Sequence, residues 1–178
     1  MSKMSIWKLS LAGLAAAALA MPALAQTPTP VKGKPVYSEH GKRPKTSSAT
    51  EKSEVALSSE DTEGRFTIQD EIWGPTMAVP PHFHKTHGEV FYLISGQLQW
   101  TVSGETHLLN PGDLQLVPPN SVHSVKVMGG KEAHVLFISS PGGYEQGEKA
   151  NEMLTPEQRK DPKLSSILNM LSDYNPVK

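Results

Sequence analysis

The feature that most constrains the fold is a series of short β-type runs between Gly64 and Ser140. These runs, from "RFTIQDEIW" to "AHVLFISSPGG", are separated at close intervals by Gly, Pro and Asn residues. Several short strands with turn residues between them are typical of a sandwich or a barrel, and no stretch of helical periodicity interrupts them. The sequence therefore predicts an all-β domain, and a chain of this length is expected to hold one such domain.

The first 25 residues have the pattern of a leader that directs export. Lys3 and Lys8 precede the apolar run "LAGLAAAALA", and "MPALA" ends the segment at Ala25. A positive start, a short apolar stretch and an A-x-A end predict a Sec-type signal peptide, residues 1–25, cleaved after Ala25. The alternative, a membrane anchor, needs about 20 unbroken apolar residues, and Pro22 and Gln26 end the run early. We therefore expect a periplasmic or secreted protein without membrane attachment after cleavage.

Charge and cysteine content exclude several classes of function. Cleavage would remove Lys3 and Lys8 from the 17 basic residues and none of the 18 acidic ones, so the net charge becomes −3 with neutral histidines. A near-neutral surface lacks the basic stripe of nucleic-acid-binding proteins, so no nucleic-acid partner is expected. The chain has no cysteine, which excludes thiolate zinc sites and cysteine nucleophiles. Any metal must be held by nitrogen and oxygen atoms.

The composition changes twice along the exported part of the chain. Residues 26–53 are rich in Pro, Ser, Thr, Lys and Glu, which predicts a flexible, disordered tether with little to bury. Residues 54–147 contain the β-type runs and are expected to form the barrel. Residues 148–178 change to helical patterns and predict a short C-terminal helical segment.

Two helix starts are recognisable in this C-terminal segment. In "TPEQ", Thr155 and Gln158 have the spacing of a capping box, and Asp161 with Pro162 repeats a start signal. An apolar stripe at helical spacing follows, which we expect to pack on the outside of the barrel. The stripe consists of Leu164, Ile167, Leu168 and Leu171.

Three histidines and a glutamate lie within eight residues of "PPHFHKTHGEVFYLISG". Residues two apart on a strand point to the same face, so His82 and His84 face one way and Phe83 the other. Glu89 follows a turn at residues 85–88, and a hairpin would bring its carboxylate next to both imidazoles. A buried carboxylate needs a compensating cation, and a divalent metal ion would supply it. Phe91 and Leu93 share the parity of Glu89 and should also point inward.

A second segment, "PGDLQLVPPNSVHSV", adds His123. The two segments together resemble the paired motifs of the cupin superfamily over about residues 60–147. His82, His84, Glu89 and Gly96 match the first motif; Gly112, Pro118 and His123 match the second. Asn120 replaces the usual Gly of the second motif, and Asn is the residue that best substitutes for Gly at left-handed backbone angles. Thr76 and Val127 also depart from the family pattern, at positions that bind no metal.

The resemblance implies a double-stranded β-helix, the cupin or jelly-roll barrel, in which His82, His84, Glu89 and His123 bind one divalent metal ion. Fe(II) is the first choice, with Mn, Ni, Co, Cu and Zn as alternatives. The resemblance also suggests a homodimer. The flanks "EDTEGRF" and "SSPGGYEQ" are similar to single-domain quercetin dioxygenase-like cupins.

That similarity implies an oxidoreductase of the dioxygenase type that acts on a small phenolic or enolic compound, with Glu89 as general base. Two alternatives stay open. One is a non-oxidative metal-dependent isomerase or decarboxylase. The other is a non-catalytic cupin that binds a small molecule.

The other histidines match no ligand position of the two motifs. His87 is interpreted as a polar turn residue, with a contact at the mouth of the pocket as the alternative. His107 and His134 are interpreted as ordinary strand residues. His40, in the tether, is expected to be solvated.

Overall fold

The computed structural model describes residues 35–48 and 50–177. The chain divides after Lys32 into two units, and every described residue belongs to the second. The predicted signal peptide, residues 1–25, and residues 26–34 of the predicted tether lie outside the described residues.

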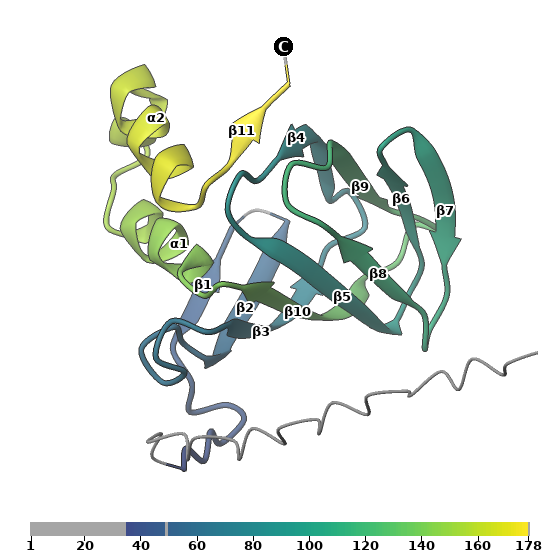
Figure 1. Ribbon diagram of the computed structural model, residues 1–178, viewed down its shortest axis with the longest axis horizontal. Helices are drawn as coiled ribbons and strands as arrows, with labels where there is room; N and C mark the ends of the chain where they lie inside the picture. The colour runs from purple at the N-terminus through teal and green to yellow at the C-terminus, as the bar shows by residue number, and fades with distance from the viewer. Residues whose placement is uncertain (1–34, 49, 178) are drawn as a thin grey trace, which may run out of the picture. The chain divides into compact units, whose positions relative to one another are not determined.

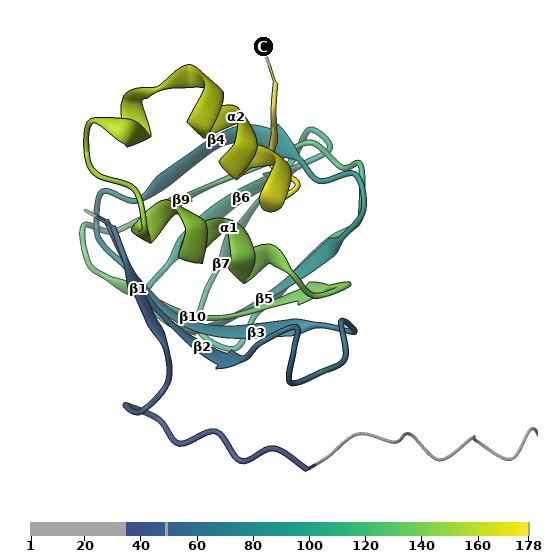
Figure 2. The same ribbon diagram turned by 90° about the vertical axis from the view of Figure 1, so that its left-hand side faces the viewer.

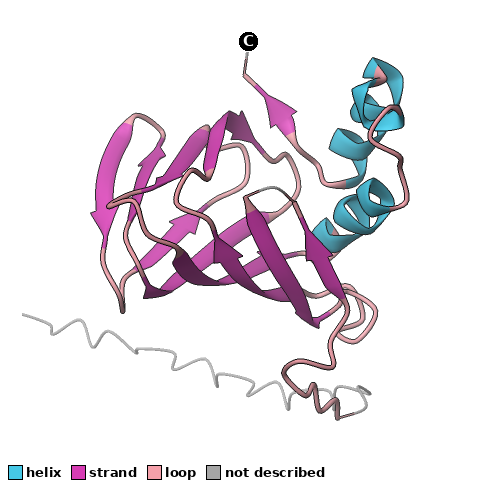
Figure 3. Ribbon diagram, turned by 180° about the vertical axis from the view of Figure 1, so that it is seen from behind, coloured by secondary structure: helices cyan, strands magenta, loops and turns pink. Residues whose placement is uncertain are grey.

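Two antiparallel sheets form the domain (Figures 1 and 3). One has six strands in the order β1-β2-β3-β10-β5-β8, and the other has five in the order β11-β4-β9-β6-β7. The predicted all-β fold is therefore confirmed. The strands are β1 Lys45–Ser47, β2 Glu51–Leu57, β3 Thr67–Trp73, β4 Ala78–Phe83, β5 Gly88–Ser95, β6 Leu98–Val102, β7 Glu105–Leu109, β8 Leu114–Val117, β9 His123–Val127, β10 Ala133–Ser140 and β11 Asn175–Pro176.

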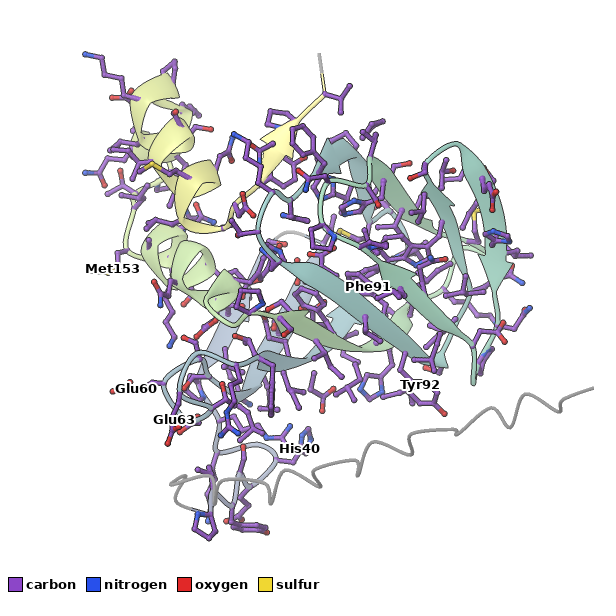
Figure 4. All side chains as sticks on the ribbon, viewed as in Figure 1. His40, Glu60, Glu63, Phe91, Tyr92 and Met153 are labelled. Carbon is purple, nitrogen blue, oxygen red and sulfur yellow. The ribbon has the colours of Figure 1, made fainter. Side chains whose placement is uncertain are left out.

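The hydrophobic core lies between the two sheets and is rich in aromatic residues. Phe91 of β5 stacks on Phe137 of β10 with ring centroids 4.7 Å apart, and Trp100 packs on Phe91 at 4.5 Å. Phe91 and Leu93 are buried, as predicted from strand parity, whereas Tyr92 between them is exposed (Figure 4). The alternation of β5 therefore separates a core face from an outer face.

The predicted tether does not extend to residue 53. Strand β1 and the first residues of β2 lie within the range 26–53, and β2 pairs with β3. The inward face of β2 carries Ser53 as well as Val55, and Gln69 Nε2 donates a hydrogen bond of 3.0 Å to Ser53 Oγ. Because this inward face is partly polar, the composition of the segment hides a strand.

The helices lie together on one side of the sheets (Figures 1 and 2). They are α1 Tyr144–Glu152, the single-turn 3-10 helix η1 Gln158–Lys160 and α2 Pro162–Leu171. Helix α1 begins within the range predicted for the barrel, after β10 has ended at Ser140. Among the described residues, no helix combines the length and the apolar character needed to span a bilayer.

Both predicted helix starts are present. Thr155 N donates to Gln158 Oε1 at 2.8 Å and Gln158 N to Thr155 Oγ1 at 3.2 Å, although this capping box begins only the short η1. Asp161 caps α2 by accepting a 2.8 Å hydrogen bond from Lys163 N. The predicted packing of the apolar stripe on the barrel is wrong, because Ile167 is 48% exposed and α2 has no buried residue.

Candidate metal centre

The four predicted ligands come from both sheets. His82 of β4 lies directly opposite His123 of β9 in the five-stranded sheet. Glu89 belongs to β5, which pairs with β10 and β8 in the six-stranded sheet. The expected hairpin between the strands of His84 and Glu89 is therefore wrong. The chain crosses from one sheet to the other between these two residues, and the carboxylate meets the imidazoles across the interior.

The four side chains converge on one buried space. His84 Nε2 lies 3.1 Å from Glu89 Oε1, and His123 Nε2 lies 3.2 Å from Glu89 Oε2. The rings of His82 and His123 are 4.1 Å apart. One nitrogen from each of His82, His84 and His123 lies within 4.8 Å of the others, and all four residues are buried. The structure thus brings all the predicted ligands together.

Backbone carbonyls set the tautomer of each ligand imidazole. A carbonyl oxygen only accepts hydrogen bonds, so each Nδ1 that contacts one carries the proton, and each Nε2 keeps its lone pair. This is the arrangement that metal-binding histidines adopt in proteins. The three pairs are His82 Nδ1 with Pro80 O at 2.9 Å, His84 Nδ1 with Asp173 O at 3.0 Å and His123 Nδ1 with Ser121 O at 2.9 Å.

A cation fits this group of atoms. The Nε2 atoms of His84 and His123 and the Oε2 atom of Glu89 are buried, and none makes a well-aligned hydrogen bond. Lone pairs that face one another at 3.1–3.2 Å repel unless a positive charge lies between them. The donor set of nitrogen and oxygen atoms suits a divalent transition metal.

The electrostatics of the site keep Glu89 ionised. Burial alone would raise the pKa of Glu89, but the neighbouring His123 and His84 side chains outweigh it and hold this pKa well below the usual range. Burial alone would lower the pKa of His84, but contact with Glu89 outweighs it and raises this pKa. Burial, followed by the proximity of His123, lowers the pKa of His82 to about 4. At neutral pH the site therefore presents an ionised carboxylate and a neutral His82.

His87 belongs to the site as well. It lies in the turn between β4 and β5 but is buried, with Nε2 at 3.5 Å from Glu89 Oε1 and Nδ1 at 3.6 Å from Asp173 Oδ2. The interpretation as no more than a polar turn residue is therefore wrong. The burial results from the C-terminal segment that covers the turn, and no spacing pattern in the sequence indicates that cover.

The C-terminal segment completes the site. Sequence reasoning missed this contribution. Strand β11 pairs with β4 (Figure 1), and Tyr174 stacks on His82 with ring centroids 4.3 Å apart. The carboxylate of Asp173 accepts hydrogen bonds of 2.7 Å from both N and Oγ1 of Thr86. This segment therefore fastens the turn that carries His87.

The other histidines lie outside the site, as predicted. His107 is exposed on β7. The Nε2 atom of His134 lies 2.5 Å from Asp70 Oδ1. His40 is 76% exposed in its side chain and lies 3.3 Å from Glu54.

A cavity of about 60 Å³ opens beside the ligands. Its walls are mostly aromatic and apolar, with two further carboxyl groups, and an aromatic lining suits a planar or apolar ligand. The lining residues are Glu51, Glu71, Trp73, Met77, Val79, His82, Glu89, Phe91, Trp100, His123, Val125, Phe137, Tyr144 and Tyr174.

Comparison with known proteins agrees with the fold and with both sequence motifs. Residues 71–139 match the family described as "Cupin domain". Residues 71–139 form a cupin domain. The predicted resemblance to the cupin superfamily is thereby confirmed. The chain is also 30% identical to quercetin 2,3-dioxygenase of Bacillus subtilis (strain 168) over 73 residues, which are 41% of this chain and only 22% of that relative.

Solved cupin structures share the architecture at low sequence identity. KdgF from Halomonas sp. matches with a TM-score of 0.54 and 16% identity, over 61% of this chain and 94% of that one. A predicted oxalate decarboxylase from Thermotoga maritima matches with a TM-score of 0.54 and 16% identity, over 60% and 99%. Ectoine synthase from P. lautus matches with a TM-score of 0.51 and 21% identity, over 59% and 75%. These structures establish the shared fold.

Proposed function

We propose that this cupin domain holds one divalent metal ion through His82, His84, Glu89 and His123. The observation that carries the proposal is the convergence of three imidazole nitrogens, with each Nδ1 held by a backbone carbonyl, and an ionised carboxylate in one buried space. Fe(II) is the first choice, and Mn, Co, Ni, Cu or Zn suit the same donor atoms.

We further propose an oxidoreductase of the dioxygenase type that acts on a small phenolic or enolic compound. A bound ion would supply the positive charge that stabilises a substrate oxygen as an anion and, if redox-active, a site for dioxygen. The similarity to quercetin 2,3-dioxygenase supports the reaction type, although it spans only 22% of that protein.

Within this reaction, Glu89 is the general base. Its low pKa keeps it ionised, so one of its oxygens can accept the proton of a substrate hydroxyl group. His87 lies 3.5 Å from Glu89 Oε1 and orients the carboxylate.

The cavity favours a small substrate. Its volume of about 60 Å³ is well below the range of about 300–1,000 Å³ typical of pockets for drug-sized ligands. The aromatic walls, which include Phe91, Trp100 and Phe137, suit an unsaturated compound. A compound as large as a flavonol would need the cover over the site, formed in part by Tyr174, to move.

A non-oxidative reaction is the second candidate, and one observation favours it. The carboxyl groups of Glu51 and Glu71 line the same cavity as the predicted ligands. Carboxyl groups beside a metal-bound substrate can donate or accept protons, which an isomerase or decarboxylase requires.

The metal proposal predicts that His84→Ala removes the ion. The variant loses one of three nitrogen ligands, so elemental analysis of the purified protein should fall from about one equivalent to well below half. His107→Ala is the matched control, because His107 is exposed and lies outside the site, and it should keep the full equivalent. A full equivalent in His84→Ala would refute the ligand assignment.

The reaction type is tested by oxygen uptake. The metal-loaded protein is mixed with a panel of small enols and phenols, and dioxygen consumption is followed together with exchange of the substrate's carbon-bound protons for solvent deuterium. Consumption that is lost in Glu89→Gln supports the dioxygenase. Proton exchange without oxygen uptake supports the non-oxidative reaction.

We also propose export, which rests on the pattern of residues 1–25. Mass analysis of protein from the exported fraction should show a chain that begins at Gln26. A chain that keeps Lys3 and Lys8 would contradict the cleavage.

A further inference from the structure

The cavity of the metal centre has a second polar wall, away from the ligands. Glu51 of β2 and Glu71 of β3 line the same cavity as Glu89. In the six-stranded sheet, Val135 of β10 pairs with Glu71 of β3 on one side and with Leu93 of β5 on the other. Leu93 is four residues along β5 from Glu89. The two carboxyl groups are therefore separate from the predicted ligands.

These carboxyl groups have no cationic partner. Carboxyl oxygens of Glu51, Glu71 and the α1 residue Glu148 lie within 4.8 Å of one another. None of the three takes part in an ion pair within the described part of the chain. Glu71 is only 2% exposed. Carboxylates this close together in a buried site cannot all be ionised, so the group retains protons.

The electrostatic surroundings favour the protonated form of Glu71. Burial raises the pKa of Glu71 well above its usual range, and the charges of Glu51, Glu148 and, to a smaller extent, Glu89 act in the same direction. Burial also raises the pKa of Tyr144 of α1, which lines the same cavity. Glu71 therefore presents a neutral carboxylic acid that can donate a hydrogen bond.

A second, independent observation points to a ligand in this cavity. The indole nitrogen of Trp100 is buried and has no hydrogen-bond acceptor among the described residues, and Trp100 lines the cavity. An indole N–H is a donor only, and buried donors in proteins normally have a partner. Glu71 Oε2 already accepts a 2.7 Å hydrogen bond from Trp73 Nε1, which leaves Oε1 as the oxygen that carries the proton. Two residues with an available donor thus line one cavity.

We propose that the cavity binds a small, oxygen-rich, uncharged or anionic compound, which ligates the metal at one end and accepts hydrogen bonds from Glu71 and Trp100 at the other. The inference rests on the proposed metal centre and defines its substrate class: an enol or hydroxycarbonyl with a further acceptor oxygen and no ammonium group. An ammonium group would instead require ionised carboxylates at Glu51 and Glu71.

Three hydroxamates with the same metal-chelating group test this. Propionohydroxamate has an apolar tail, methoxyacetohydroxamate has an ether oxygen, and glycine hydroxamate has an ammonium group. Each is titrated into the full chain loaded with Co(II), and binding is followed in the visible spectrum of the ion. Methoxyacetohydroxamate should bind about 5-fold to 10-fold more tightly than propionohydroxamate, as one or two new hydrogen bonds allow, and glycine hydroxamate should bind most weakly.

Variants separate a contact with the ligand from a structural role. Glu71→Gln keeps a neutral donor and should keep the preference for the ether oxygen within about 2-fold, whereas Glu71→Leu should abolish most of it. Trp100→Phe keeps a ring, removes the N–H donor and should weaken the preference independently. Glu105→Gln, at an exposed position of β7, is the control and should behave as wild type. A purely structural role would change all three affinities equally and leave their ratios unchanged.

Two kinds of failure are distinguishable. If glycine hydroxamate binds most tightly, or if the affinity ratios are the same in wild type, Glu71→Leu and Trp100→Phe, the inference is overturned while the metal centre stands. If no hydroxamate changes the spectrum of the bound Co(II), the inference is likewise overturned. If the chain does not bind Co(II), the metal centre itself is refuted and the inference with it.

Discussion

At the scale of single residues, backbone carbonyls orient the ligand imidazoles. Two of these carbonyls are local, since Pro80 and Ser121 each lie two residues before the histidine that they hold. The third is remote, because Asp173 O holds His84 across 89 positions of the chain. Two ligand orientations are therefore encoded locally, one at the end of β4 and one at the start of β9, and the third depends on the position of the C-terminal segment.

The buried carboxyl group of Glu148 predicts a stability that falls as pH rises. Burial raises its pKa from 4.5 to about 8 in the folded protein, so between these values the folded chain keeps a proton that the unfolded chain releases. The free energy of unfolding then falls with rising pH, by at most about 1.4 kcal/mol per pH unit. Glu148→Gln cannot ionise and should reduce this fall.

Urea unfolding of the metal-free protein at pH 5.5 and pH 7.5 checks this prediction. Glu157→Gln is the control, because Glu157 is an exposed carboxyl group that does not act on Glu148, and it should retain the pH dependence of the wild type. An equal slope in Glu148→Gln and in the wild type would contradict the assignment of a protonated Glu148.

At the scale of elements, the turn between β5 and β6 depends on a glycine that cannot be replaced. Gly96 has φ of +87°, and a Cβ there would lie 2.6 Å from Glu132 O and 2.7 Å from Ala133 Cα. Gly104, in the turn after β6, has φ of +88° and nothing within 4 Å. The two positions thus share backbone strain and differ in steric contact.

Alanine at these two glycines should therefore have unequal effects. Each substitution places a side chain at a left-handed angle, at about 1–2 kcal/mol, and Gly96→Ala adds a backbone clash of about 1–3 kcal/mol. The unfolding midpoint in urea should fall further for Gly96→Ala than for Gly104→Ala. Equal midpoints would show that the turn adjusts without cost.

The C-terminal segment is the other element on which the site depends. Truncation after Leu171 removes the carbonyl that holds His84 and the Tyr174 ring that stacks on His82, while the two sheets keep their core. Loss of groups that orient metal ligands typically lowers affinity by about 10-fold to 100-fold. Metal titration should show that loss, and a chain that ends at Pro176, with β11 intact, should bind as wild type.

At the scale of the whole molecule, we propose that two copies of the chain associate through one outer face. Tyr92 and Ile94 of β5 and Leu114 and Leu116 of β8 are exposed, and Tyr92 lies opposite Leu114 in the register. Strand β8 ends the six-stranded sheet, so its outer edge is free to pair. Contiguous exposed apolar residues often mark an interface, which supports the expected homodimer.

Light scattering tests this arrangement. The wild type should have the mass of a dimer, and the double variant Leu114→Asp and Leu116→Asp should have that of a monomer with its metal content unchanged. Leu108→Asp, at an exposed position on β7 of the other sheet, is the control and should remain a dimer. A wild-type monomer at high concentration would exclude a stable homodimer.

The sequence by itself determined those features that depend on neighbours a few residues apart. The alternation of Glu89, Phe91 and Leu93 assigns a core face because side chains on a strand alternate. His82 and His84 are likewise both more buried than Phe83 between them, although His84 lies one residue beyond the end of β4. The cap at Asp161 was recognisable because it contacts a residue only two positions away.

Only the tertiary structure decided the features that depend on distant contacts. These are the pairing of β4 with β9 in place of a hairpin with β5, the burial of His87 beneath the C-terminal segment, and the approach of Glu71 and Glu148. Each joins residues separated by tens of positions, and local preferences carry no information about such pairs. The packing of the whole chain therefore selects them, because burial of the core stabilises only one arrangement of the strands.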